Sequence, residues 1–591
     1  MEHDAGSLLR RLAFPVSLIA AAVLFAATAV QPLHLDNVDF PAAAAAAART
    51  GLPVYYRGEF TPALSGLFHP PLYIYSLAAW FRAFGEGPVQ ARAFGFVCAL
   101  LLGWIWLEIW RTLAGRRAGG AGVWFWPLFL LNPYTLQGAS ITDIDTTVYG
   151  PLLAGILLAS LRMGWRGGTP RSDAVRPREW AWLAALMALA LWAKLTTVWA
   201  VLPAAALLLA PRLGVRKAML GTAAAALSAI ALFLVTYALY GWLTGLDVWY
   251  SVRFTIESFL IRGTNASQGV AGRLSAYGSN LQFMAPFHAR WTGVLPWILM
   301  AAATAAAFRR AWREASPRDR ALGVLLALAL GVTVYYCAHT PTYGLAPFKY
   351  VYVFWPAAVL CVADFMERAF QTAASGSGAK ARRLEVAAAC VWLAGTAATL
   401  VWAGDRLLYE NRMLWPQSLA LWIPAAAAAL AVFFNKHAWA AAVLVAAVAA
   451  SGGFSLGVAA AQAKARYSTT YDYGQEGLAE TACYLRTHTE PGDRLVCMKD
   501  VGYLAERRYY STYSAIQGVP EYMNAILRVL ESGEARYAVF TEGRGQDNLA
   551  LNPRLQAGVE QFCRLERSIG HYRIYACGGS EKGPPVNARR R

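Results

Sequence analysis

The sequence predicts a polytopic α-helical membrane protein of about thirteen transmembrane helices, followed by a small C-terminal α/β domain. Of its 591 residues, 57% are hydrophobic, and the mean hydropathy is +0.37. Apolar stretches long enough to cross a bilayer recur between residues 12 and 460, and basic connectors alternate with acidic and aromatic ones. Because basic connectors stay in the cytoplasm, this alternation predicts both the spans and their orientation.

The spans are predicted as helices because only a helix satisfies its own backbone hydrogen bonds inside lipid. The first follows two arginines, as a signal peptide does, but it is long and has no clear small-residue cleavage site, so we expect a retained helix. The block 180–211 exceeds the bilayer thickness, which predicts a hairpin with Lys194 at its outer turn. The predicted spans are 12–33, 92–112, 121–138, 144–163, 180–195, 197–211, 218–243, 291–308, 321–338, 350–366, 386–403, 417–434 and 438–460.

The formal net charge of +18 comes largely from the connectors assigned to the cytoplasm. Positive charge also suits nucleic acid, but here the topology and anionic lipid headgroups account for it. We therefore expect membrane lipids and no nucleic acid as partners. The predicted location is the inner (cytoplasmic) membrane, with the N-terminus in the cytoplasm and the C-terminal domain outside.

Two outer connectors are large. The first, 34–90, is assigned to the transmembrane domain 1–461 and contains an alanine-rich helix and an aromatic segment suited to the membrane interface. The second, about 244–290, is strongly basic and includes Arg262.

The composition changes to that of a soluble domain at residue 462. The runs RLVCM, YAVFT and YRIYAC are rich in β-formers, and helical patterns fit 474–488 and 520–533. This alternation predicts an α/β domain over 462–578, followed by a disordered tail over 579–591. An extracytoplasmic location permits two disulfides with three possible connectivities among Cys483, Cys497, Cys563 and Cys577.

Two acidic motifs fall at the predicted outer surface, where carboxylates near a membrane are candidates for function. Asp36 and Asp39 follow the first span: an acid held there suits a general base, and it equally suits the N-cap of the alanine-rich helix. Asp143 and Asp145, at i and i+2, do not share a helix face, so one can face a cavity while the other caps a helix. The four acids suit a divalent cation such as Mg²⁺ or Mn²⁺, an acceptor hydroxyl, or both. No motif requires a cofactor or a metal.

Three cations are predicted at the same level: Lys194, Arg92 and Lys349. Snorkelling to the interface explains each one singly. Together, opposite the acids, they suit an anionic group, and a lipid phosphate is the natural anion at that depth. We expect these charged groups to meet in one outer cleft, lined also by Asn37, His69, Tyr73, His339 and Tyr350.

Several short motifs follow one another in a fixed order along the chain. They are Asp36-Asn37, the alanine run 42–48, Thr50-Gly51, Pro70-Pro71-Leu72-Tyr73, Phe84-Gly85, Ala91-Arg92, Asp143/Asp145, Lys349-Tyr350 and Pro356. This ordered set, over nearly the whole chain, resembles the GT-C polytopic glycosyltransferases, in particular the bacterial branch related to protein O-mannosyltransferases and lipid A aminoarabinose transferases. No single motif is specific. The family's Asp-Glu pair is Asp-Asn here, so the second carboxylate is missing.

The resemblance implies an inverting glycosyltransferase that moves a sugar from a polyprenyl-phosphate donor to an envelope acceptor (lipid, polysaccharide or protein). Asp36 would be the catalytic base, and Lys194, Lys349, Arg92 and Arg262 would stabilise the departing lipid phosphate. The alternative is a transporter or flippase of a glycolipid, which predicts ionisable residues near the bilayer midplane, whereas these spans carry almost none there. A third class is a receptor or scaffold whose C-terminal domain binds a partner.

Overall fold

The computed structural model forms two compact units. Unit 1 contains Met1–Val30, Leu67–Ala465 and Thr469–Tyr471, and unit 2 contains Gln31–Gly66, Arg466–Ser468 and Asp472–Arg591. The structure describes residues 2–30, 33, 36–53, 69–115, 121–196, 198–249, 251–253, 255–256, 272, 274–275, 277–278, 294–313, 316–339, 349, 352–374, 476–512, 520–542 and 549–577.

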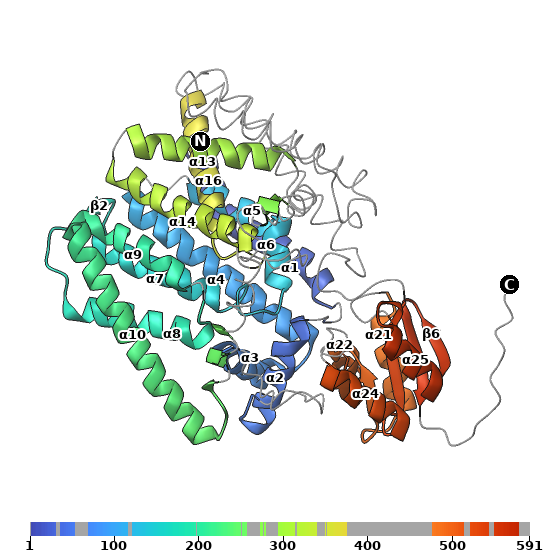
Figure 1. Cartoon of the computed structure of the whole chain (residues 1–591). Helices are drawn as coiled ribbons and strands as arrows, with labels where there is room; N and C mark the ends of the chain where they lie inside the picture. Colours follow the sequence, from blue (N-terminus) through green and yellow to red (C-terminus); the bar gives the residue numbers. More distant parts are fainter. Residues whose placement is uncertain are drawn as a thin grey trace. The chain divides into compact units, whose positions relative to one another are not determined.

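The described part of unit 1 is almost entirely helical (Figure 1). Its described helices, in chain order, are α1 (Glu2–Ala29), α3 (Leu72–Phe84), α4 (Pro88–Ala114), α5 (Ala121–Leu130), α6 (Pro133–Ser140), α7 (Tyr149–Gly164), α8 (Pro177–Ala193), α9 (Val198–Leu213), α10 (Val215–Thr244), α13 (Val294–Arg313), α14 (Pro317–His339) and α16 (Trp355–Ala374). The two-residue strands β1 (Trp165–Arg166) and β2 (Thr169–Pro170) pair antiparallel between α7 and α8.

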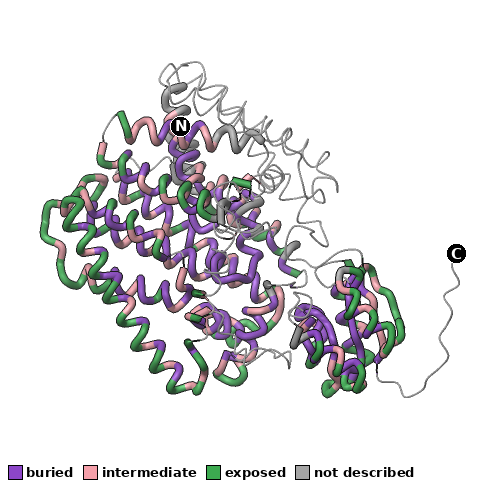
Figure 2. The backbone as a smooth tube through the Cα atoms, viewed as in Figure 1, coloured by how far each residue is buried: buried purple, intermediate pink, exposed green. Residues whose placement is uncertain are grey.

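Among the described helices, α4 and α10 are long and apolar enough to cross a membrane. Shorter apolar helices cover Leu12–Ala26, Tyr149–Gly164, Val198–Leu213 and Trp355–Phe365. Helix α10 buries Ala218, Thr222, Ala225, Ala229 and Phe233 at intervals of three or four residues, while its other side exposes large apolar residues (Figure 2). A helix that is apolar all round suits lipid on its outer face, so the chain fits a polytopic membrane protein.

Most described spans lie where the sequence predicts them, and two differ. The span 121–138 is divided into α5 and α6 at Asn132, because Pro133 has no backbone N–H and begins a new helix. The span 144–163 begins only at Tyr149, after an irregular connector. The block 180–211 is a pair of helices interrupted at Lys194, as predicted. The spans predicted at 386–403, 417–434 and 438–460 lie outside the described residues.

Unit 2 contains a five-stranded mixed sheet in the order β4-β3-β5-β7-β6. Strand β3 pairs parallel with β4 and β5, while β7 pairs antiparallel with β5 and β6. Buried side chains from its helices and strands form two apolar clusters. The elements are α21 (Leu478–His488), β3 (Arg494–Cys497), α22 (Lys499–Ala505), β4 (Arg508–Ser511), α24 (Pro520–Ser532), β5 (Tyr537–Thr541), η3 (Leu549–Leu551), α25 (Pro553–Phe562), β6 (Cys563–Ile569) and β7 (Tyr572–Cys577).

The strands predicted from RLVCM, YAVFT and YRIYAC correspond to β3, β5 and β7, while β4 and β6 are additional. Of the possible cysteine pairings, Cys563–Cys577 is present. These residues lie directly opposite each other in the β6–β7 register, with Cα atoms 4.4 Å apart. Cys483 is exposed on α21 and Cys497 is buried in β3.

Unit 2 also contains α2 (Asp36–Thr50), the predicted alanine-rich helix. We assigned segment 34–90 to the transmembrane domain 1–461, but the structure groups 31–66 with the C-terminal unit. The physical reason is a contact between α2 and α22, in which Leu33 and two α2 side chains form an apolar cluster with Tyr503. The sequence break at residue 462 does not reveal this contact.

Candidate active site

The connector between α6 and α7 is folded by its own polar side chains. The backbone N–H of Asp145 donates to Asp143 Oδ1 at 3.1 Å, and Thr147 Oγ1 donates to the Asp143 carbonyl at 2.6 Å. Thr146 Oγ1 donates to the carbonyl of Ile141 at 2.9 Å. Short side chains that bond nearby backbone replace helix hydrogen bonds in this way. The run TDIDTT thus holds both carboxylates in fixed, buried positions.

Each carboxylate meets one of the predicted cations. Lys349 Nζ lies 2.8 Å from Asp143 Oδ2, and Lys194 Nζ lies 2.5 Å from Asp145 Oδ2. The side chains of the second pair are only 6% and 1% exposed. Residues from three distant segments therefore form one cluster of four charges, which we call the four-charge cluster: Asp143, Asp145, Lys194 and Lys349.

Close helix packing places the two lysines. Helix α8 ends at Ala193, and extended backbone at Lys194 turns its side chain out of the helical path. On the other side, a Cβ added to Gly138 of α6 would lie 2.1 Å from the ring of Tyr352, so only glycine permits this contact. Trp355 Nε1 donates to Thr135 Oγ1 at 3.1 Å. Helix α6 thus holds the segment around Lys349 against the connector.

By formal charge the four-charge cluster is balanced, since two carboxylates face two ammonium groups. Burial would raise the pKa of Asp143, but the charges of Lys349 and Lys194 outweigh it and hold that pKa well below its usual range. Asp143 is therefore ionised at neutral pH. Each ammonium has three N–H donors, so one lysine can hold more than one oxygen at a time.

Two other residues that the sequence places in the outer cleft also lie in unit 1. Tyr73 on α3 is fully buried, and burial together with the charge of nearby Asp143 raises the pKa of its hydroxyl. Arg92 is also fully buried, and its Nη1 donates to the Ala29 carbonyl at 3.0 Å, at the C-terminal end of α1. This contact satisfies a carbonyl that the helix leaves open. Arg92 therefore has a structural role at the end of α1, and its contact with a lipid phosphate stays a prediction.

The remaining predicted residues are not brought to the four-charge cluster by described contacts. Asp36 and Asn37 begin α2 in unit 2, where their side chains lie outside the description, and Asp39 pairs with Lys499 of the same unit. His69 is half-buried just before α3, and His339 ends α14 with an undescribed side chain. Arg262 and Tyr350 lie outside the described residues. The role of Asp36 stays a prediction.

A preformed metal site does not fit the described side chains. Nowhere in the described ranges do three His, Cys, Asp or Glu side chains gather as ligands. Asp143 and Asp145 each hold a lysine, which Mg²⁺ or Mn²⁺ would have to displace.

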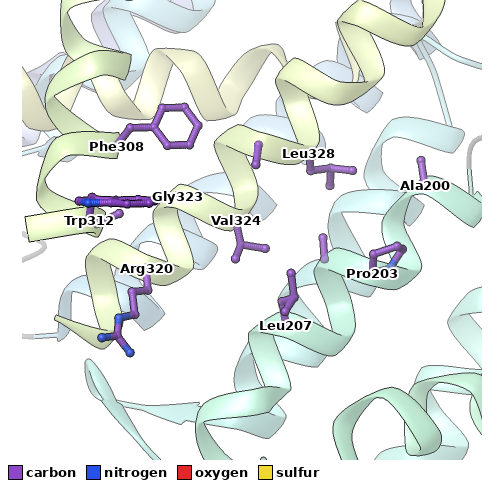
Figure 3. Close-up of a pocket in the computed structure, with 12 residues that line it drawn as sticks. Ala200, Pro203, Leu207, Phe308, Trp312, Arg320, Gly323, Val324 and Leu328 are labelled. Atoms are coloured by element: carbon purple, nitrogen blue, oxygen red, sulfur yellow. The ribbon is translucent and has the colours of Figure 1, made fainter. Parts of the chain in front are cut away.

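A cavity of about 450 Å³ lies elsewhere in unit 1, between α9, α13 and α14. Figure 3 shows apolar side chains such as Leu207, Val324 and Leu328 along it, with the Arg320 side chain at one end. None of the described residues that line this cavity carries a carboxylate, so they offer no acidic group that could act as a base.

Sequence reasoning missed the residues that support the four-charge cluster. The hydroxyls of Thr146 and Thr147 were visible in TDIDTT as turn formers, and this signal was sufficient to find them. Gly138 and Tyr352 gave no such signal, because a close contact between distant segments leaves no local pattern.

Comparisons with known proteins identify the fold. No protein-family model matches the sequence, and no curated protein matches it significantly. The apo structure of ArnT from Cupriavidus metallidurans is similar with a TM-score of 0.57 at 15% identity, over 97% of this chain and 98% of that one. The structure of the same protein bound to undecaprenyl phosphate gives a TM-score of 0.53 at 16% identity, over 97% and 99% of the two chains. The chain therefore shares the fold of ArnT, and this fold agrees with the GT-C resemblance seen in the sequence.

Proposed function

We propose that the protein is an inverting glycosyltransferase that moves a sugar from a polyprenyl-phosphate donor to a lipid, polysaccharide or protein of the cell envelope. The observation that carries the proposal is the four-charge cluster. Three of its members, Asp143, Asp145 and Lys349, occupy the two places where the resemblance has an acidic motif and a basic-Tyr motif, in a chain whose fold resembles ArnT along nearly its whole length. Recognition of undecaprenyl phosphate by a protein of this fold supports the choice of donor.

In the proposed reaction, an acceptor hydroxyl or amine attacks the anomeric carbon while the bond from that carbon to the phosphate oxygen breaks. The electron pair of the broken bond leaves with the lipid phosphate, and Asp36 takes the acceptor's proton. The role of Asp36 comes from the resemblance alone. A positioned base typically contributes about 10²–10⁴-fold to the rate.

Lys194 and Lys349 would stabilise the charge that develops on the departing phosphate. Their pairing with Asp145 and Asp143 fixes where the two ammonium groups lie, and preorganised donors of this kind typically contribute about 10²–10³-fold each. The carboxylates also balance the positive charges of the lysines inside a buried site. A carboxylate has about four lone-pair sites, so Asp143 and Asp145 would also accept a hydrogen bond from an acceptor hydroxyl.

We further propose that the reaction takes place at the outer face of the cytoplasmic membrane. The alternation of basic connectors supports an N-terminus in the cytoplasm and a C-terminal domain outside. Donor and acceptor would then meet at the level where the spans begin and end.

Mass spectrometry of glycolipids, envelope polysaccharide and envelope proteins in a deletion strain tests the proposal. We expect one of these molecules to lose a saccharide and to regain it when the wild-type gene is restored. Asp36→Asn should fail to restore it, whereas Asp247→Asn should succeed, because Asp247 forms only an exposed ion pair with Arg253. An unchanged envelope in the deletion strain contradicts transfer. A glycolipid trapped on the inner leaflet, with transfer intact, supports the flippase instead.

A further inference from the structure

An ion pair inside unit 2 joins two segments that are 460 residues apart. Lys499 Nζ lies 2.6 Å from Asp39 Oδ2. Both side chains are largely buried, with 11% and 18% of their surfaces exposed. Asp39 lies in the first turn of α2, and Lys499 is the first residue of α22. An ion pair with this little exposure orients its partners more strongly than a surface pair does.

An apolar contact lies beside the ion pair. Val38 and Ala42, one turn apart on α2, form a buried cluster with Leu33, and Tyr503 packs against it. Tyr503 follows Lys499 by four residues, so both side chains extend from one side of α22. The first turn of α2 is therefore held by two independent contacts with the same short helix.

The sheet makes α22 a rigid support. The helix follows β3 directly, and a Cβ added to its Gly502 would lie 2.2 Å from the ring of Tyr509 in β4. The backbone of α22 thus packs tightly onto a strand. Val501 and Ala505 of the same helix are fully buried in the core of the unit.

Position 36 lies one turn before position 39 on the same side of α2, about 4.5 Å along the helix axis at 1.5 Å per residue. We propose that Lys499 is a positioning residue: through Asp39, the C-terminal domain holds the first turn of α2 and thereby the base, Asp36. This inference rests on the proposed role of Asp36. It gives the C-terminal domain, which carries no catalytic motif of its own, a task in the reaction.

Kinetics of the full-length protein test the inference. Lys499→Met should lower kcat about 10²-fold with little change in KM for the lipid donor, because displacement of a reacting group by about 1 Å costs that much. Lys499→Arg should retain most activity, since it restores the charge. The double variant Asp39→Asn/Lys499→Met should lose no more than Lys499→Met alone, because the contact is already broken. Glu542→Gln, which removes an exposed ion pair with Arg573, is the matched control and should leave kcat unchanged.

Additive losses in the double variant, or near-normal kcat in folded Lys499→Met, would overturn the inference. Hydrogen exchange separates this failure from failure of the proposed function, because it needs no activity. Amides of residues 36–50 should exchange faster in Lys499→Met than in wild type, while those of β3 and β5 stay protected. Unchanged exchange in α2 overturns the inference even if transfer is established. If Asp36 proves not to be the base, faster exchange establishes only that Lys499 holds α2, and the positioning of a base is overturned together with the proposed role of Asp36.

Discussion

Replacing Lys194 by methionine removes one partner of an ion pair whose side chains are 6% and 1% exposed. At 2.5 Å and an effective dielectric constant of about 20, the two charges attract each other by about 7 kcal/mol. Much of this attraction is offset by the cost of taking both charges out of water, which is several kcal/mol per ion. After the substitution, however, Asp145 stays buried without its counterion. We expect Lys194→Met to lower the free energy of unfolding by about 3–5 kcal/mol.

The double variant Lys194→Met/Asp145→Leu removes both charges, so its free energy of unfolding should lie within about 2 kcal/mol of wild type. Titration of protein in mixed micelles with a denaturing detergent, followed by tryptophan fluorescence, measures both variants. Lys217→Met is the matched control, because Lys217 is exposed at the start of α10 and should change stability by less than about 0.5 kcal/mol. A loss below about 1 kcal/mol in the single variant, or a double variant as unstable as the single one, would refute the reasoning.

Two further predictions concern the second ion pair and its support. Lys349→Met should lower the transfer rate about 10²–10³-fold in assays with purified protein. Its stability loss should be smaller than that of Lys194→Met because Lys349 is 17% exposed, and a rate above one-tenth of wild type contradicts its role. Gly138→Ala should cost about 1–3 kcal/mol of stability and reduce transfer, because the new methyl group meets the Tyr352 ring. Gly155→Ala, with nothing within 4 Å of the new Cβ, should be neutral or stabilising, and equal losses in thermal unfolding of the two variants would argue against the contact.

The sequence predicted those parts of the fold and site that depend on local chemistry. Apolar runs specify helices because lipid offers no partner for backbone groups, and Lys194 interrupts such a run where the chain must turn. Asp143 and Asp145 were found as a rare acidic pair at a predicted membrane surface. Lys194 and Lys349 were predicted at the same level as these acids, as ligands for a lipid phosphate. The structure adds that each lysine pairs with one of the carboxylates.

The remaining features depend on contacts between distant segments, for which a single sequence has no signal. Lys499 lies in RLVCMKD, an ordinary strand-to-helix passage, and nothing there indicates Asp39. The sequence also does not reveal that α2 belongs to unit 2, because an alanine-rich helix does not specify what it packs against. For Arg92 the residue type alone suggested a role that its described contact does not test. An arginine suits a phosphate, whereas the described contact is with the Ala29 carbonyl at the end of a helix.

The equal number of positive and negative side chains in the four-charge cluster has a consequence for substrate choice. A cluster whose charges cancel projects little electrostatic potential beyond its own diameter, so it would not concentrate soluble anions such as inorganic phosphate or nucleotides from the surrounding water. A phosphate would reach the lysines only when another force delivers it, and a prenyl chain dissolved in the bilayer supplies that force. In the proposed reaction, partition of the prenyl chain into the bilayer would concentrate lipid-linked phosphates at the site but not water-soluble anions. The lysines would then act only on anions that arrive along the membrane.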